Sequence, residues 1–77
     1  METYYEVTLT VHLIGTSLTI YDKMSASELK ATLLNLQQDT GTLSIESKVE
    51  ETSYFVRNKH ITGYELDKVE YDYEDDF

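Results

Sequence analysis

Residues 5–13 have the sequence YEVTLTVHL, in which apolar or aromatic side chains alternate with polar ones. This period of two, together with the many β-branched residues, predicts a half-buried β-strand. The segment GTS at 15–17 interrupts the alternation, which resumes as Leu18 and Ile20 alternate with polar or aromatic neighbours. Two alternating segments joined by a short loop that contains glycine predict an antiparallel hairpin.

The next segment predicts a helix with a defined start. Ser25 is followed three residues later by Glu28, which is the spacing of a capping box, and Met24 and Leu29 have the spacing of a hydrophobic staple. Apolar residues then recur at steps of three and four, which places them on one helix face. The residues of this face are Ala26, Leu29, Leu33 and Leu36, and Leu34 widens it.

The second half of the chain returns to strand patterns. Gly41 is expected to end the helix, which we predict over residues 26–38. A third strand is predicted over 43–50, and two further strands, 54–57 and 61–66, are expected to form a hairpin around a polar loop. We therefore predict an α+β fold of ββαβββ order, with a small antiparallel sheet and one helix packed on one face.

Negative charge is concentrated near the end of the chain. The protein has 77 residues and a net charge of -9, and we expect a single α+β domain over residues 1–66 followed by an acidic, aromatic tail over 67–77. This tail contains six carboxylates against one lysine, so it holds more than half of the net charge. Mutual repulsion of like charges opposes compaction, so their concentration favours binding to a cationic partner.

No catalytic, cofactor or metal site is predicted. The chain has no cysteine, and neither His12 nor His60 has an acid at metal-ligand spacing. Neither a nucleophile motif nor a glycine-rich phosphate loop is present. The protein is therefore predicted not to be an enzyme and to use no cofactor. Its apolar runs are short, so we expect neither a signal peptide nor a membrane span, and we expect a cytoplasmic location.

Carboxylates and aromatic residues are the candidate binding groups. In an extended tail, the rings of Tyr71 and Tyr73 would lie opposite the carboxylates of Asp72 and Glu74. Together with acids of the sheet they would imitate a nucleic-acid backbone, so the expected partner is a protein with a basic nucleic-acid-binding surface. The alternative is an inert, solubilising tail. The candidate residues are Glu46, Glu50, Glu51, Glu65, Tyr71, Asp72, Tyr73, Glu74, Asp75, Asp76 and Phe77.

The net charge also disfavours direct binding to nucleic acid, because phosphates would be repelled. The helix-free face of the sheet is expected to carry polar and aromatic side chains. These are Thr8, Thr10, His12, Thr19 and Tyr21. One open face and exposed strand edges make a homodimer a further expectation.

Two segments resemble a known family of inhibitors. YEVTL at 5–9 and YDKMSASEL at 21–29 are similar to the strand, hairpin and helix start of small acidic proteins that Bacillus phages make against uracil-DNA glycosylase. In that family, a dimer of small α+β subunits imitates DNA and offers an apolar pocket to the enzyme. The resemblance implies a phage or mobile-element inhibitor that acts in the host cytoplasm. It also places Glu28, with Leu29 and Leu33, near the binding region.

The last residues support an alternative. Glu74-Asp75-Asp76-Phe77 is similar to the tips of phage and bacterial single-stranded DNA-binding proteins, where a terminal phenylalanine docks in a basic-rimmed pocket. This similarity implies a replication or recombination accessory protein that recruits partners through its tail and contacts single strands through Arg57 and Lys59. A structural, homo-oligomeric domain is the third possibility.

Overall fold

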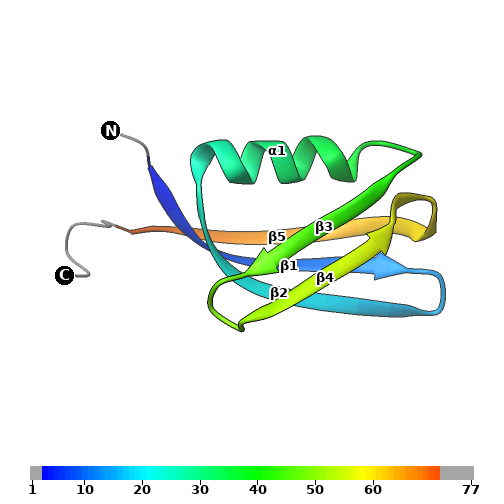
Figure 1. Cartoon of the computed structure of the whole chain (residues 1–77), viewed down its shortest axis with the longest axis horizontal. Coiled ribbons are helices and arrows are strands. Elements are labelled where there is room, and N and C mark those ends of the chain that lie inside the picture. Colours follow the sequence, from blue (N-terminus) through cyan, green and yellow to red (C-terminus); the bar gives the residue numbers. More distant parts are fainter. Residues whose placement is uncertain (1–2, 72–77) are drawn as a thin grey trace.

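The computed structural model describes residues 3–71, which form two antiparallel sheets and one α-helix (Figure 1). The larger sheet has the order β2-β1-β5, and its strands are β1 (Tyr4–Leu13), β2 (Thr16–Ser25) and β5 (Ile61–Tyr71). The smaller sheet is a hairpin of β3 (Thr42–Ser47) and β4 (Thr52–Arg57). Helix α1 (Ala26–Leu36) follows β2, and a short 3-10 helix, η1 (Asn58–His60), precedes β5. The predicted α+β class and element order are confirmed, and all strand pairs are antiparallel, but the strands form two sheets where a single sheet was predicted.

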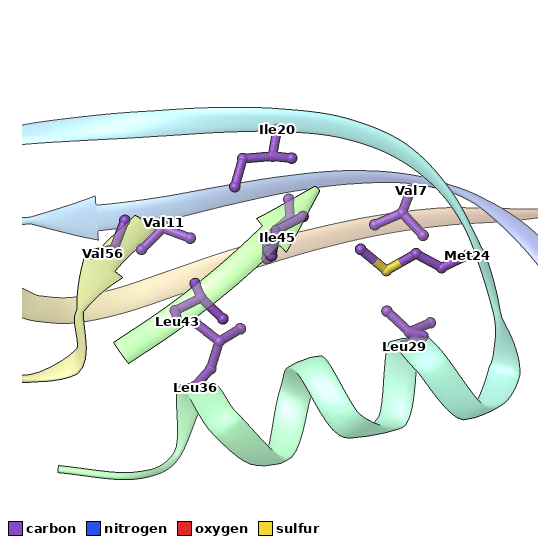
Figure 2. Packing of buried hydrophobic residues seen from close by; sticks show 10 residues of the cluster. Val7, Val11, Ile20, Met24, Leu29, Leu36, Leu43, Ile45 and Val56 are labelled. Carbon is purple, nitrogen blue, oxygen red and sulfur yellow. The ribbon is translucent and has the colours of Figure 1, made fainter. Parts of the chain in front are cut away.

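One hydrophobic core joins the two sheets and the helix (Figure 2). Alternation along β1 directs Val7, Leu9 and Val11 to the same face of the larger sheet, where each is at most 3% exposed. Both α1 and the β3–β4 hairpin pack on this face. The other buried apolar residues are Ile20 and Met24 of β2, Leu29 and Leu36 of α1, and Leu43, Ile45 and Val56 of the hairpin.

The start of α1 is as predicted. The Ser25 hydroxyl accepts a hydrogen bond from the Glu28 backbone N–H at 3.2 Å, and the Glu28 carboxylate accepts one from the Ser25 N–H at 3.4 Å. These two bonds satisfy backbone donors that a helix start otherwise leaves without partners. Met24 and Leu29 are both buried in the core, as the hydrophobic staple requires.

The predicted hairpin of residues 54–57 and 61–66 is wrong. β4 pairs with β3 over six residue pairs, and β5 pairs with β1 over ten, so residues 54–57 and 61–66 do not form a hairpin. The polar segment between them forms η1, which leads the chain from one sheet to the other. Pairing with β1 gives β5 a longer ladder of backbone hydrogen bonds than pairing with the six-residue β4 could give. It also provides partners for the backbone groups on the edge of β1 that β2 does not cover.

Several element ends also differ from the prediction. Helix α1 ends at Leu36 with Gln37 as its C-cap, and Gly41 instead adopts a φ of 96° in the loop before β3. The third strand ends at Ser47, because residues 48–51 form the turn of the hairpin and Val49 is 54% exposed there. β5 runs to Tyr71, so the first five residues of the expected tail lie in the larger sheet.

The turn of the β3–β4 hairpin is held against the outer edge of β2 by hydrogen bonds. The Tyr21 N–H donates to Glu50 Oε1 at 3.1 Å, and the Ser47 hydroxyl donates to the Tyr21 carbonyl oxygen. The Lys48 N–H donates to Asp22 Oδ1 at 2.9 Å. Asp22 and Ser47 are both buried. These polar contacts fix where the hairpin crosses the larger sheet. They also provide hydrogen-bond partners for backbone groups on the outer edge of β2, which point away from β1.

Candidate binding surfaces

The face of the larger sheet opposite the core is left open within the described part of the chain (Figure 1). Strand register places the even-numbered residues of β1 on this face, beside the odd-numbered residues of β2 and β5. Three carboxylates therefore share it: Glu6 on β1, and Glu65 and Asp67 on β5. All three residues are exposed. We call Glu6, Glu65 and Asp67 the acidic face.

Aromatic and cationic groups lie at one end of the open face. The rings of Tyr4 and Tyr71 are 6.2 Å apart, and Lys23 Nζ lies 5.0 Å from the centre of the Tyr71 ring. Both contacts are of the kinds that aromatic rings favour. Further along the sheet, His12 Nε2 lies 3.8 Å from Glu65 Oε2, a pair that is ionic only when the imidazole is protonated. The open face thus combines rings with carboxylates.

Glu28 lies away from this face, in the first turn of α1. Its carboxylate contacts Lys48 Nζ at 3.3 Å, in addition to its capping bonds with Ser25. Partial burial raises the pKa of the Glu28 carboxyl, but the hydrogen bonds from Lys48 and Ser25 outweigh this effect and leave that pKa below its ordinary value. Burial lowers the pKa of the Lys48 ammonium, and Glu28 more than compensates, so that pKa is raised. Glu28 therefore has partners within the fold.

Three candidate acids belong to the β3–β4 hairpin. Glu50 accepts hydrogen bonds from the Tyr21 N–H and, at 2.9 Å, from the Tyr54 hydroxyl. The hydrogen bond to Glu50, with some burial, raises the pKa of the Tyr54 hydroxyl. Glu51 has a φ of 54° in the turn, and its side chain is exposed. Glu46 is exposed on the outer side of β3, opposite Ser53.

The predicted binding residues are therefore not gathered on one surface. Of those described, only Glu65 and Tyr71 share the open face, while Glu28 and Glu46 lie on elements that cover the other face. Glu50 serves to hold the hairpin turn. The remaining candidates lie outside the described residues. They are Asp72, Tyr73, Glu74, Asp75, Asp76 and Phe77.

Sequence reasoning missed two residues of the acidic face, Glu6 and Asp67. The signal for Glu6 was available, because the alternation of residues 5–13 already places it on the polar side of β1. The charge pattern places Asp67 in the expected tail over 67–77, not on the sheet. Its place beside Glu65 depends on β5 pairing with β1, which no local pattern specifies.

A second surface lies between the β1–β2 turn and β4, at the end of the molecule opposite to Tyr4 and Tyr71. Two of the side chains that line it are large, apolar and mostly exposed, Ile14 and Phe55, each 72% exposed. Arg57 and His60 add polar nitrogen donors to the lining. We call this surface the end groove. Its lining residues are Leu13, Ile14, Thr16, Phe55, Val56, Arg57 and His60.

No protein-family model, curated protein or solved structure matches this chain. Across residues 3–71, no three histidine or acidic side chains are close enough together to hold a metal ion. The same residues include no helix that is both long and apolar enough to cross a membrane. Function must be inferred from the acidic face and the end groove.

Proposed function

We propose that this protein is a non-enzymatic inhibitor, of the kind that phages or mobile elements encode, which occupies the basic cleft of a nucleic-acid-binding protein in the host cytoplasm. The acidic face is the observation that supports this proposal. It puts three exposed carboxylates on an uncovered sheet face. Carboxylates displayed in this way attract the lysine and arginine side chains that otherwise bind phosphates.

The spacing of the acidic face suits such a partner. Glu65 and Asp67 are two positions apart on β5, and a strand advances about 3.3 Å per residue, so their Cα atoms are about 7 Å apart. Glu6 lies on the neighbouring strand opposite Val69, two residue pairs further along the ladder than Asp67. The result is a two-row array of negative charge on a rigid sheet, and this array loses little conformational entropy on binding.

The segment after β5 extends the acidic face in sequence. Residues 72–77 add four carboxylates and two aromatic rings directly after Tyr71. A partner cleft that contacts the end of β5 would therefore meet further negative charge and rings. Aromatic anchors with carboxylates around them are typical of contacts that dominate binding energy.

The experiment compares two variants of equal net charge. Glu6→Gln, Glu65→Gln and Asp67→Asn together neutralise the acidic face. Asp39→Asn, Glu46→Gln and Glu51→Gln neutralise three exposed acids elsewhere. Each immobilised full-length protein is mixed with heparin-enriched proteins of a bacterial lysate, and bound proteins are eluted with duplex DNA.

We expect the unaltered protein and the second variant to capture a DNA-eluted protein, and the acidic-face variant to capture at least about tenfold less. Capture should also fall steeply between about 50 and about 200 mM salt. Thermal unfolding of both variants verifies that the fold is kept. Equal capture by both variants, or a bound protein that DNA does not elute, would refute the proposal.

A further inference from the structure

The end groove and the C-terminal end of β5 lie at opposite ends of the larger sheet. β5 starts next to the groove, because His60 lines the groove and Ile61 pairs with Leu13. It then runs the length of the larger sheet to Tyr71, which pairs with Tyr4 at the opposite end (Figure 1). The molecule is 40 Å long in this direction and only 21 Å across. The end groove is thus remote from Tyr71, the residue that the acidic segment 72–77 follows in sequence.

The end groove has the features of a docking site for an acidic, aromatic segment. Ile14 and Phe55 contribute large exposed apolar surfaces to its lining, and Arg57 and His60 contribute hydrogen-bond donors. No carboxylate is among the described residues that line it. Lys59, next to His60, adds a further positive charge at this end. A ligand with rings and carboxylates close together would match both the apolar side chains and the donors of the groove.

Such a segment occurs in the chain itself. Residues 72–77 have the sequence DYEDDF, with four carboxylates around Tyr73 and before Phe77. This is the only stretch of the sequence with that density of negative charge and two rings. Its chemistry is complementary to the groove in both respects, since rings would contact Ile14 and Phe55 while carboxylates pair with Arg57.

The segment cannot span the groove of its own molecule. The eleven residues of β5 place Tyr71 about 33 Å from Ile61, which pairs with Leu13 at the far end of the groove. Six further residues extend by at most about 20 Å, so they stay more than 10 Å short of this end, where Leu13, Ile14 and His60 line the groove. Docking that uses both Ile14 and Phe55 therefore requires the groove of another molecule.

We propose that residues 72–77 of one copy dock in the end groove of a second copy, so that copies associate head to tail. The contact is heterologous, because it joins two different surfaces, and it leaves a free groove at one end and a free segment at the other. It therefore extends to chains of copies as concentration rises. This inference does not rest on the proposed inhibitory function, although that proposal also uses residues 72–77 as an extension of the acidic face.

Net charge does not prevent this association. Each copy carries a charge of -9, but at about 0.15 M salt charges separated by more than about 8 Å are largely screened from each other. A tail carboxylate in the groove would be within this distance of Arg57, whereas the acidic face lies elsewhere on the sheet. Local attraction is thus retained while long-range repulsion is reduced.

The test uses two full-length variants, each defective in one half of the contact. The groove variant is Phe55→Ser, an exposed position where the fold should tolerate the change. The tail variant combines Asp75→Asn, Asp76→Asn and Phe77→Ser. Val69→Ser, at a 66% exposed position away from the groove, is the matched control. Mass in solution is measured by analytical ultracentrifugation from about 10 μM to about 1 mM, the range expected for a small contact.

We expect the unaltered protein and the Val69→Ser control to increase in mass with concentration, beyond that of a dimer. Each defective variant alone should stay at the monomer mass of 8.9 kDa. An equimolar mixture of the two should form one-to-one complexes and nothing larger. The intact tail of the groove variant can dock in the intact groove of the tail variant, and the complex then has neither an intact groove nor an intact tail left to extend it. Mass that does not change with concentration, association that either variant retains, or a mixture without complexes would overturn the proposal.

Discussion

The two faces of the larger sheet differ in the burial and the polarity of their side chains. On the covered face, Val7, Leu9 and Val11 are nearly inaccessible to solvent and contact both the helix and the hairpin. On the open face, the alternating residues of the same strand are Glu6, Thr8 and Thr10, none of which is buried. A single strand thus contributes apolar burial on one side and exposed polar groups on the other.

This difference separates the residues that hold the fold from those that are available for binding. Burial of apolar surface is the main favourable contribution to folding, so changes on the covered face should alter stability. Changes on the open face should leave the fold in place and alter only what it binds. The following substitutions test that separation, from the largest expected effect to the smallest.

Leu9→Ala should destabilise the protein by about 2 to 5 kcal/mol, because it leaves a cavity at a position that is 1% exposed. Thr10→Ala, one residue further along β1 and on the other face, is expected to cost less than about 1 kcal/mol. Denaturant unfolding measures both. A domain of this size is marginally stable, so Leu9→Val provides a milder form of the same test. Similar losses for Leu9→Ala and Thr10→Ala would contradict the separation of the two faces.

Asp22→Leu should destabilise the protein by about 1 to 3 kcal/mol, although it adds apolar surface to the covered face. Its Oδ1 accepts hydrogen bonds from the N–H groups of Lys23 and Lys48, and the substitution leaves these donors without that acceptor. Asp22→Asn keeps an oxygen acceptor and is expected to restore most of the loss. Chemical denaturation of the two variants gives the comparison. Equal stability of Asp22→Leu and the unaltered protein would show that the hairpin turn needs no polar attachment.

Glu28→Gln should have the smallest effect, less than about 1 kcal/mol, because both partners of its ion pair with Lys48 are largely solvent-exposed. The pKa of Glu28 is lowered in the folded state, so its contribution is present above the ordinary carboxyl pKa and is lost as pH falls through the folded value. The difference between Glu28→Gln and the unaltered protein should therefore be larger at about pH 7 than at about pH 3. Unfolding free energies at the two pH values measure it, and a difference that grows toward acid would reverse the predicted sign.

Local sequence patterns predicted the helix and strands better than they predicted which strands pair. The alternation of β1, the hairpin with β2 and the capping box of α1 all depend on residues close in sequence, and each is found in the structure. The pairing of β5 with β1 joins distant segments, and alternation alone cannot specify which of two edges a strand will meet. The prediction joined β4 to β5 because they are neighbours in sequence, although β1 offers the longer ladder.

The binding residues show the same limit. Composition indicated that carboxylates matter, but it could not show that Glu28 and Glu50 have structural partners while Glu6 and Asp67 face solvent together. Their roles follow from the register of three strands and from the position of the hairpin turn. A carboxylate that faces solvent in one strand register can have a hydrogen-bond or ion-pair partner in another. Sequence alone does not specify the register.

The central position of β1 has a consequence for synthesis on the ribosome. β1 is the first strand to emerge, and it can pair with β2 soon afterwards, but its other edge stays unpaired until β5 has been made. Until then the nascent chain displays a free edge ten residues long with apolar groups on one side. Slow translation or premature termination within 42–60 would prolong this exposure and favour aggregation before the native sheet can close.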